Sequence, residues 1–204
     1  MNRAGPGRVE PLVHRSLLFL SLLAASAALA EPLHVSVNLT TGGRWLEGMK
    51  VWAGKNAVQL EGDELTMGGT LDLTKRLGLL RLGGQVSADV MLFPRDLGVV
   101  RSGPLATSAI SSDESVSSLL FVSAAPFVGL GGGRAGELQG WVDLLVSLEL
   151  ATARVERERH FALTPVPTLR VGGSVPIGDA GLELSLLASY FGAPRLALAM
   201  GVHF

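Results

Sequence analysis

The sequence contains no cysteine and few charged or aromatic residues. The absence of cysteine excludes disulfide scaffolds, cysteine-ligated zinc, iron–sulfur clusters and thiol catalysis. Charged residues make up only 17% of the 204 positions, and the formal net charge of -1, with no basic block, argues against nucleic-acid binding. Hydrophobic residues make up 48%, and the mean hydropathy of +0.39 excludes a disordered chain. This composition is typical of a membrane protein.

The first thirty residues have the features of a secretory signal peptide. Arginines lie before an apolar run of 13 residues, Leu17–Leu29, and a small-x-small cleavage motif ends at Ala30. The alternative is an uncleaved anchor, but a helix needs ~20 apolar residues to span a bilayer. We therefore predict a signal peptide helix over 1–30, cleaved after Ala30, and a mature domain over 31–204.

The mature chain alternates apolar and polar residues with a period of two, which indicates β-strands. Between Leu79 and Phe93, apolar residues at even positions alternate with Arg81, Gln85 and Asp89. Segment 119–131 is also strand-like but is apolar on both faces. The pattern recurs around 33–39, 65–73, 138–150, 168–175, 182–190 and 196–204. Together these segments predict eight antiparallel strands.

The predicted connections alternate between long and short. The long ones are 41–63 and 94–117; the short ones are 74–78, 132–136 and 178–181; the charged stretch 154–160 is intermediate, and 192–195 breaks the series. Long outer loops and tight inner turns are typical of an up-and-down barrel in a bacterial outer membrane. An even strand number then places both ends of the barrel on the periplasmic side.

Segment 44–60 has two interpretations. Short alternating pieces on either side of Gly54-Lys55-Asn56 could form an extracellular hairpin, or they could make the barrel ten-stranded. We favour the hairpin because each piece is shorter than a membrane-crossing strand of ~9 residues.

Alternation alone fits two kinds of β-barrel. In a soluble, lipocalin-like barrel the apolar face is the core, whereas in a membrane barrel it meets lipid. The polar faces here are rich in serine, threonine and glycine, and a water-facing surface usually carries more charge. Small polar residues suit the interior of a narrow barrel. We therefore predict that the apolar faces point outward.

Charged residues on the predicted lumen face should form ion pairs. A bare carboxylate in a narrow interior is costly, so Arg81 and Arg170 are expected to pair with some of the acids. Such a network would plug the lumen, because side chains fill the interior of an eight-stranded barrel; a narrow polar path is the alternative. The predicted lumen network comprises Asp72, Arg81, Gln85, Asp89, Asp143, Glu149, Arg170 and Glu183.

Two histidines are candidates for catalysis or metal binding. His34 and Ser36 resemble the His-x-Ser pair of some outer-membrane lipid A deacylases, but their lumen position would keep them from lipid. Glu156, Glu158 and His160 would gather at a solvated strand end, with ion pairs across the strands rather than a bound metal. We predict no catalytic residue, no metal site and no cofactor.

The final strand and one internal strand carry a family resemblance. Phe204 ends an alternating strand and resembles the signal read by the barrel-assembly machinery of Gram-negative bacteria. Segment 124–133, Ala-Ala-Pro-Phe-Val-Gly-Leu-Gly-Gly-Gly, resembles the Pro-aromatic-x-Gly-x-Gly strand of the porin-like outer-membrane β-barrel domain family, which includes the W and X types. This resemblance implies a monomer in the outer membrane, with membrane lipids and the assembly machinery as partners.

These observations predict an all-β protein, an eight-stranded antiparallel up-and-down transmembrane β-barrel. Its expected role is structural or interactive, with loops 41–63 and 94–117 presented outside and the lumen plugged. The alternatives are a narrow channel for small or hydrophobic solutes and a soluble exported barrel that binds an apolar ligand. No enzymatic activity is expected.

Overall fold

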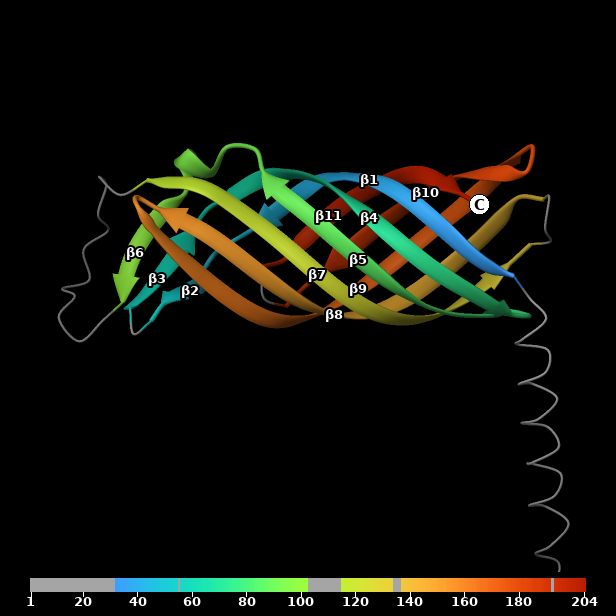
Figure 1. Ribbon diagram of the computed structural model, residues 1–204, viewed down its shortest axis with the longest axis horizontal. Coiled ribbons are helices and arrows are strands. Elements are labelled where there is room, and N and C mark those ends of the chain that lie inside the picture. The colour runs from blue at the N-terminus through green and yellow to red at the C-terminus, as the bar shows by residue number, and fades with distance from the viewer. Residues whose placement is uncertain (1–31, 55, 103–114, 134–136, 192) are drawn as a thin grey trace, which may run out of the picture.

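The computed structural model of the chain describes residues 32–54, 56–102, 115–133, 137–191 and 193–204, and the predicted signal peptide lies outside them. Eight antiparallel strands follow one another around a closed barrel, and the last pairs with the first (Figure 1). They are β1 (Leu33–Trp45), β4 (Asp63–Leu77), β5 (Leu80–Met91), β7 (Val116–Gly132), β8 (Gln139–Val155), β9 (Glu158–Ile177), β10 (Ala180–Ser189) and β11 (Arg195–His203). The predicted eight-stranded up-and-down topology is confirmed.

The two ends of the barrel differ. At the turn end, where β1 begins and β11 ends, β4–β5 and β9–β10 are joined by two-residue turns. Gly78 and Gly178 in these turns have φ of 65° and 63°, a left-handed backbone that favours glycine. The opposite, loop end carries the connections from β1 to β4 and from β5 to β7. In the described residues, no helix has the length and hydropathy to cross a membrane.

Three further strands form a side sheet at the loop end. They are β2 (Met49–Ala53), β3 (Asn56–Glu61) and β6 (Gly98–Ser102), which follows a short 3₁₀ helix, η1 (Pro94–Asp96). The sheet continues from β9 in the order β2-β3-β6. The predicted hairpin in 44–60 is confirmed: β1 pairs directly with β4 from Leu33↔Lys75 to Trp45↔Asp63, so β2 and β3 lie outside the eight-strand ring.

Strand length explains where the side sheet attaches. β9 has 20 residues and β10 has 10, and their pairing ends at Thr168↔Ser189. The part of β9 that precedes Thr168 in the sequence has no partner on β10. There β2 pairs with β9 through Trp52↔Phe161. The side sheet therefore continues the barrel wall above the shorter strands.

Several strands extend further than the sequence predicted. The stretch 154–160 is not a connection, because β8 runs to Val155 and β9 begins at Glu158 after a tight turn in which Glu156 has a φ of 53°. β1 extends through 41–45, and β6 lies within the predicted loop 94–117. At the end of β8, inward-facing Ala151 and Ala153 alternate with Thr152 and Arg154, so large apolar residues no longer mark the outward face.

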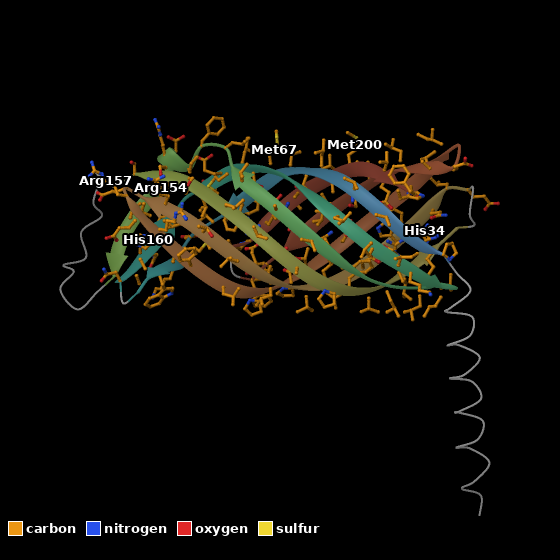
Figure 2. The ribbon with its side chains drawn as sticks, viewed as in Figure 1. His34, Met67, Arg154, Arg157, His160 and Met200 are labelled. Atoms are coloured by element: carbon orange, nitrogen blue, oxygen red, sulfur yellow. The ribbon has the colours of Figure 1, made fainter. Side chains whose placement is uncertain are left out.

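The apolar faces of the barrel strands point outward. Large hydrophobic side chains such as Leu39 and Leu163 are exposed along the wall, and Met67 and Met200 project away from it (Figure 2). Serine, threonine and charged side chains point into the lumen. The soluble lipocalin-like alternative is wrong, because it requires the apolar faces to form the core.

Candidate functional site

An ion network fills the middle of the lumen. The Asp143 carboxylate accepts from Arg170 Nη2 at 2.8 Å and from Arg81 Nε at 3.1 Å. Arg170 Nη1 also donates to Asp72 Oδ1 at 2.9 Å. Asp143 has no exposed surface, and these two guanidinium groups balance its charge. We call Asp72, Arg81, Gln85, Asp143 and Arg170 the central network.

Strand register brings the central network together. Asp143 on β8 and Arg170 on β9 are direct partners across the strands, as are Asp72 on β4 and Gln85 on β5. Gln85 Nε2 donates to Asp72 Oδ1 at 2.8 Å, and Asn38 Nδ2 donates to Asp72 Oδ2 at 2.9 Å. Each buried carboxylate therefore has several donors, which the low dielectric of the interior requires.

Aromatic rings and glycines support these arginines. The Arg81 guanidinium lies 4.4 Å from the centre of the Trp141 ring, and that of Arg170 lies 4.8 Å from the centre of Phe127. Gly129, in the glycine-rich stretch of β7, lies directly opposite Asp143. Its lack of a side chain leaves the space that the Asp143 carboxylate occupies.

A second group of ion pairs, the upper network, lies nearer the loop end. Arg44 donates to both Glu149 oxygens, at 2.6 and 2.9 Å, and its guanidinium carbon lies 3.7 Å from the centre of the Phe121 ring. Arg195 Nη1 lies 2.9 Å from Asp89 Oδ2. Asp89 and Glu149 thus belong to a separate cluster from Asp72 and Asp143. The upper network comprises Arg44, Asp89, Glu149 and Arg195.

Sequence reasoning missed Arg44 and Arg195. Arg44 fell in the predicted loop 41–63 and Arg195 in the predicted break 192–195. The signal was present, because both residues keep the lumen-facing phase of their strands: Arg44 lies six positions after Asn38, and Arg195 lies two positions before Ala197.

Glu183 lies at the turn end, apart from both networks. The Ser36 hydroxyl hydrogen-bonds to its carboxylate, and His203 Nδ1 lies 3.4 Å from its Oε1. The predicted eight-residue set is therefore divided into three clusters along the lumen. His34 and Ser36 both lie on the lumen side, and the His34 ring centre is 6.3 Å from that of His203. This pair cannot reach lipid from inside the barrel.

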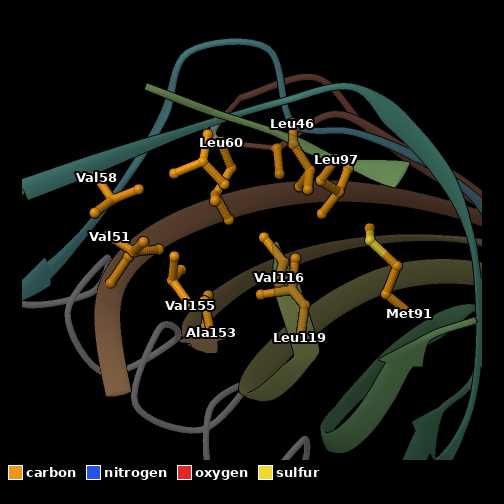
Figure 3. Close-up of a cluster of buried hydrophobic side chains, with 14 of the residues drawn as sticks. Leu46, Val51, Val58, Leu60, Met91, Leu97, Val116, Leu119, Ala153 and Val155 are labelled. Carbon is orange, nitrogen blue, oxygen red and sulfur yellow. The ribbon is translucent and has the colours of Figure 1, made fainter. Parts of the chain in front are cut away.

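An apolar cluster, the mouth cap, fills the interior at the loop end (Figure 3). It forms where the inner faces of β2, β3 and β6 pack against the inner faces of β7, β8 and β9. Sequence reasoning did not predict it. Its members are Leu46, Val51, Val58, Leu60, Met91, Leu97, Val99, Val116, Leu119, Phe121, Ala151, Ala153, Val155, Ala162 and Ala193.

His160 does not lie at a solvated strand end, as the sequence had suggested. It alternates with exposed Arg159 and Phe161, so its side chain points inward and is only 3% exposed. Its Nε2 lies 4.0 Å from Oε2 of exposed Glu158, while Glu156 is in the turn. Among the described residues, no group of three or more histidines and acids could hold a metal ion.

Two small cavities lie beside these clusters. One cavity of about 20 Å³ lies beside Arg44 and Arg195, and another of about 10 Å³ lies beside Arg81 and Glu183. Each could hold about one water molecule. A larger cavity of about 170 Å³ lies at the turn end and is lined by residues that include His34 and Phe204.

Comparison with known proteins identifies the fold. No protein-family model and no curated protein matches the sequence. The crystal structure of Neisserial surface protein A (NspA) matches with a TM-score of 0.53 and 11% identity, over 84% of this chain and 95% of that one. Ail, the attachment invasion locus protein of Yersinia pestis, matches with a TM-score of 0.49 and 10% identity, over 84% and 98%.

The chain has the fold of an eight-stranded antiparallel β-barrel of the transmembrane class, and the NspA structure is similar to it in fold. The structure supplies the feature that the class requires, an apolar outer wall around a polar interior.

Proposed function

We propose that this protein is an integral outer-membrane barrel of a Gram-negative bacterium whose lumen does not conduct and whose role is structural and interactive. The arrangement that supports the proposal is the placement of side chains in the lumen. The central and upper networks occupy its length, and the mouth cap occupies its loop end. A permeation path would have to separate buried ion pairs and then cross an apolar cluster.

The two ends of the barrel support an orientation. The tight β4–β5 and β9–β10 turns lie at one end, and the long connections and the side sheet lie at the other, together with the tight β8–β9 turn; bacterial barrels likewise have short periplasmic turns and long outer loops. Exposed aromatic residues near the loop end suit a membrane interface. They are Trp45, Trp52, Phe93, Phe161, Tyr190 and Phe191. The side sheet and the β8–β9 hairpin would then face the cell exterior.

The proposed partners of the protein are membrane lipids and the barrel-assembly machinery. The outer wall would contact membrane lipids, and Phe204, exposed after the outward-facing residues of β11, would be read by the barrel-assembly machinery. The closed ring of strands leaves no barrel edge for pairing with a second copy, which supports a monomer. No catalytic role, cofactor or nucleic-acid partner is proposed.

Planar-bilayer recording tests the closed lumen. The purified, folded barrel should give no regular conductance steps. Steps of uniform size in the wild-type protein would instead support the narrow channel. Membrane fractionation with a cold and a boiled SDS gel tests the location: a band in the outer membrane that shifts on boiling is expected, and a soluble band without a shift would contradict the proposal.

A further inference from the structure

On the outward face of the β8–β9 hairpin, apolar side chains are replaced by basic ones close to the tip. Outward-facing cross-strand pairs follow one another in the order Leu148↔Pro165, Leu150↔Leu163, Thr152↔Phe161 and Arg154↔Arg159. Three pairs that carry apolar or aromatic side chains are thus followed by two arginines. Figure 2 shows Arg154 near the tip of this hairpin.

Arg154 and Arg159 lie directly opposite each other on neighbouring strands. Both are exposed, and no carboxylate of the described residues lies within 4.0 Å of Arg154, Arg157 or Arg159. Glu158, between them in sequence, points toward His160 on the inner face. Like charges directly opposite on neighbouring strands are destabilising, so this arrangement favours a bound anion.

The register gives the depth of the pair relative to the membrane. Arg154 and Arg159 lie one outward-facing step beyond Thr152 and Phe161, which corresponds to about 6.6 Å along a strand. With a strand tilt of 35–45°, this is about 5 Å along the membrane normal. Since Phe161 belongs to the exposed aromatic residues near the loop end, the arginines lie at the depth of lipid headgroups.

A hydroxyl group extends the row onto the next strand. Ser118 on β7 is exposed and is the direct partner of Arg154 on β8. Ser118, Arg154 and Arg159 therefore form one row across three strands, which we call the basic row. Guanidinium groups bind phosphate oxygens in a bidentate manner, and a hydroxyl adds a further donor.

We propose that the basic row binds a phosphate group of a phosphorylated glycolipid in the outer leaflet, with the acyl chains of that lipid against the apolar pairs below. The apolar steps ending at Phe161 favour a lipid over a soluble anion, because a soluble ligand would make no use of them. The inference rests on the proposed function, since it requires the loop end to face the outer leaflet.

Lipid A with both phosphates, and the same lipid with its phosphates removed, are suitable probes. Binding to the purified, folded barrel in detergent is measured by native mass spectrometry for the wild type and for Arg154→Gln/Arg159→Gln. The control, Arg95→Gln/Arg157→Gln, removes two exposed arginines of the loop end that lie outside the row. A gel shift on boiling verifies that each variant is folded.

The wild type and the control should prefer the phosphorylated lipid. The basic-row variant should lose about tenfold or more of its affinity for that lipid and keep its weak binding of the dephosphorylated one. Equal binding by all three proteins, or an equal loss in both variants, would overturn the inference.

Two soluble probes distinguish other sources of the anion. Inorganic phosphate and a sulfated oligosaccharide should bind much more weakly than lipid A. Tight binding of either one without lipid A preference would overturn the lipid assignment in favour of a soluble polyanion. If the protein were absent from the outer membrane on fractionation, the proposed function itself would fail, which is a separate result.

Discussion

Gly129 on β7 lies directly opposite Asp143 on β8, and a side chain at position 129 would overlap the Asp143 carboxylate. The carboxylate that holds Arg81 and Arg170 therefore depends on a missing side chain one strand away. The glycine-rich stretch of β7 therefore serves the packing of lumen side chains against the barrel wall.

Gly129→Ala should destabilise the barrel by about 1–3 kcal/mol, because the added methyl group must displace either the Asp143 carboxylate or the Val142 carbonyl. Urea unfolding in phospholipid vesicles, followed by tryptophan fluorescence, measures the free energy. Gly132→Ala is the matched control, since a methyl group there meets no atom within 4 Å. An equal effect of both substitutions would contradict the packing argument.

Asp143→Ala should cost about 3–5 kcal/mol, because it leaves Arg81 without a carboxylate partner and Arg170 with only Asp72. The same unfolding assay applies. Glu47→Ala, which removes an exposed acid from the β1–β4 connection, should change stability by no more than about 0.5 kcal/mol. A small effect of Asp143→Ala would mean that water already screens the central network.

The Arg44–Glu149 pair should show strong non-additivity. Arg44→Met alone or Glu149→Leu alone leaves one buried charge unpaired and should cost about 3–5 kcal/mol. The double variant should regain most of that loss, because no charge remains. A double-mutant cycle on the free energies of unfolding measures the coupling, and additive losses would show that the two charges do not depend on each other.

Leu60→Ala should loosen the mouth cap and leave the ring of eight strands closed. Leu60 is fully buried on β3, whereas β1 and β4 pair independently of it. Limited proteolysis should cut the side sheet of the variant faster than that of the wild type, while the band that shifts on boiling persists. Lys50→Ala, on the exposed face of β2, should leave the cleavage rate unchanged. Loss of the shifted band in Leu60→Ala would mean that the cap holds the whole barrel together.

Local patterns in the sequence predicted the barrel because each strand alternates strictly. Leu82, Val86 and Val90 point outward and Gln85 and Asp89 inward, as their positions require. The same phase extended to Thr40 and Arg44 would have placed Arg44 in the lumen.

The mouth cap could not be predicted in this way. It depends on pairings such as Trp52↔Phe161 and Leu60↔Val99, which join short segments far apart in the sequence. The alternation in 44–60 indicates the hairpin of β2 and β3, but it does not show that this hairpin pairs with β9 and β6. His160 was misplaced for a related reason. Its side chain points inward because of the pairing between β8 and β9, and the charged residues around it in the sequence do not indicate that pairing.

The attachment of β2 to β9 also has a kinetic consequence. Trp52 and Phe161 are 161 − 52 = 109 positions apart, and such distant contacts form late because a long loop must close first. The β2–β3 hairpin can fold locally, but its place in the wall exists only once β9 is in position. The mouth cap is therefore completed in one of the last steps of folding, after most of the ring has formed.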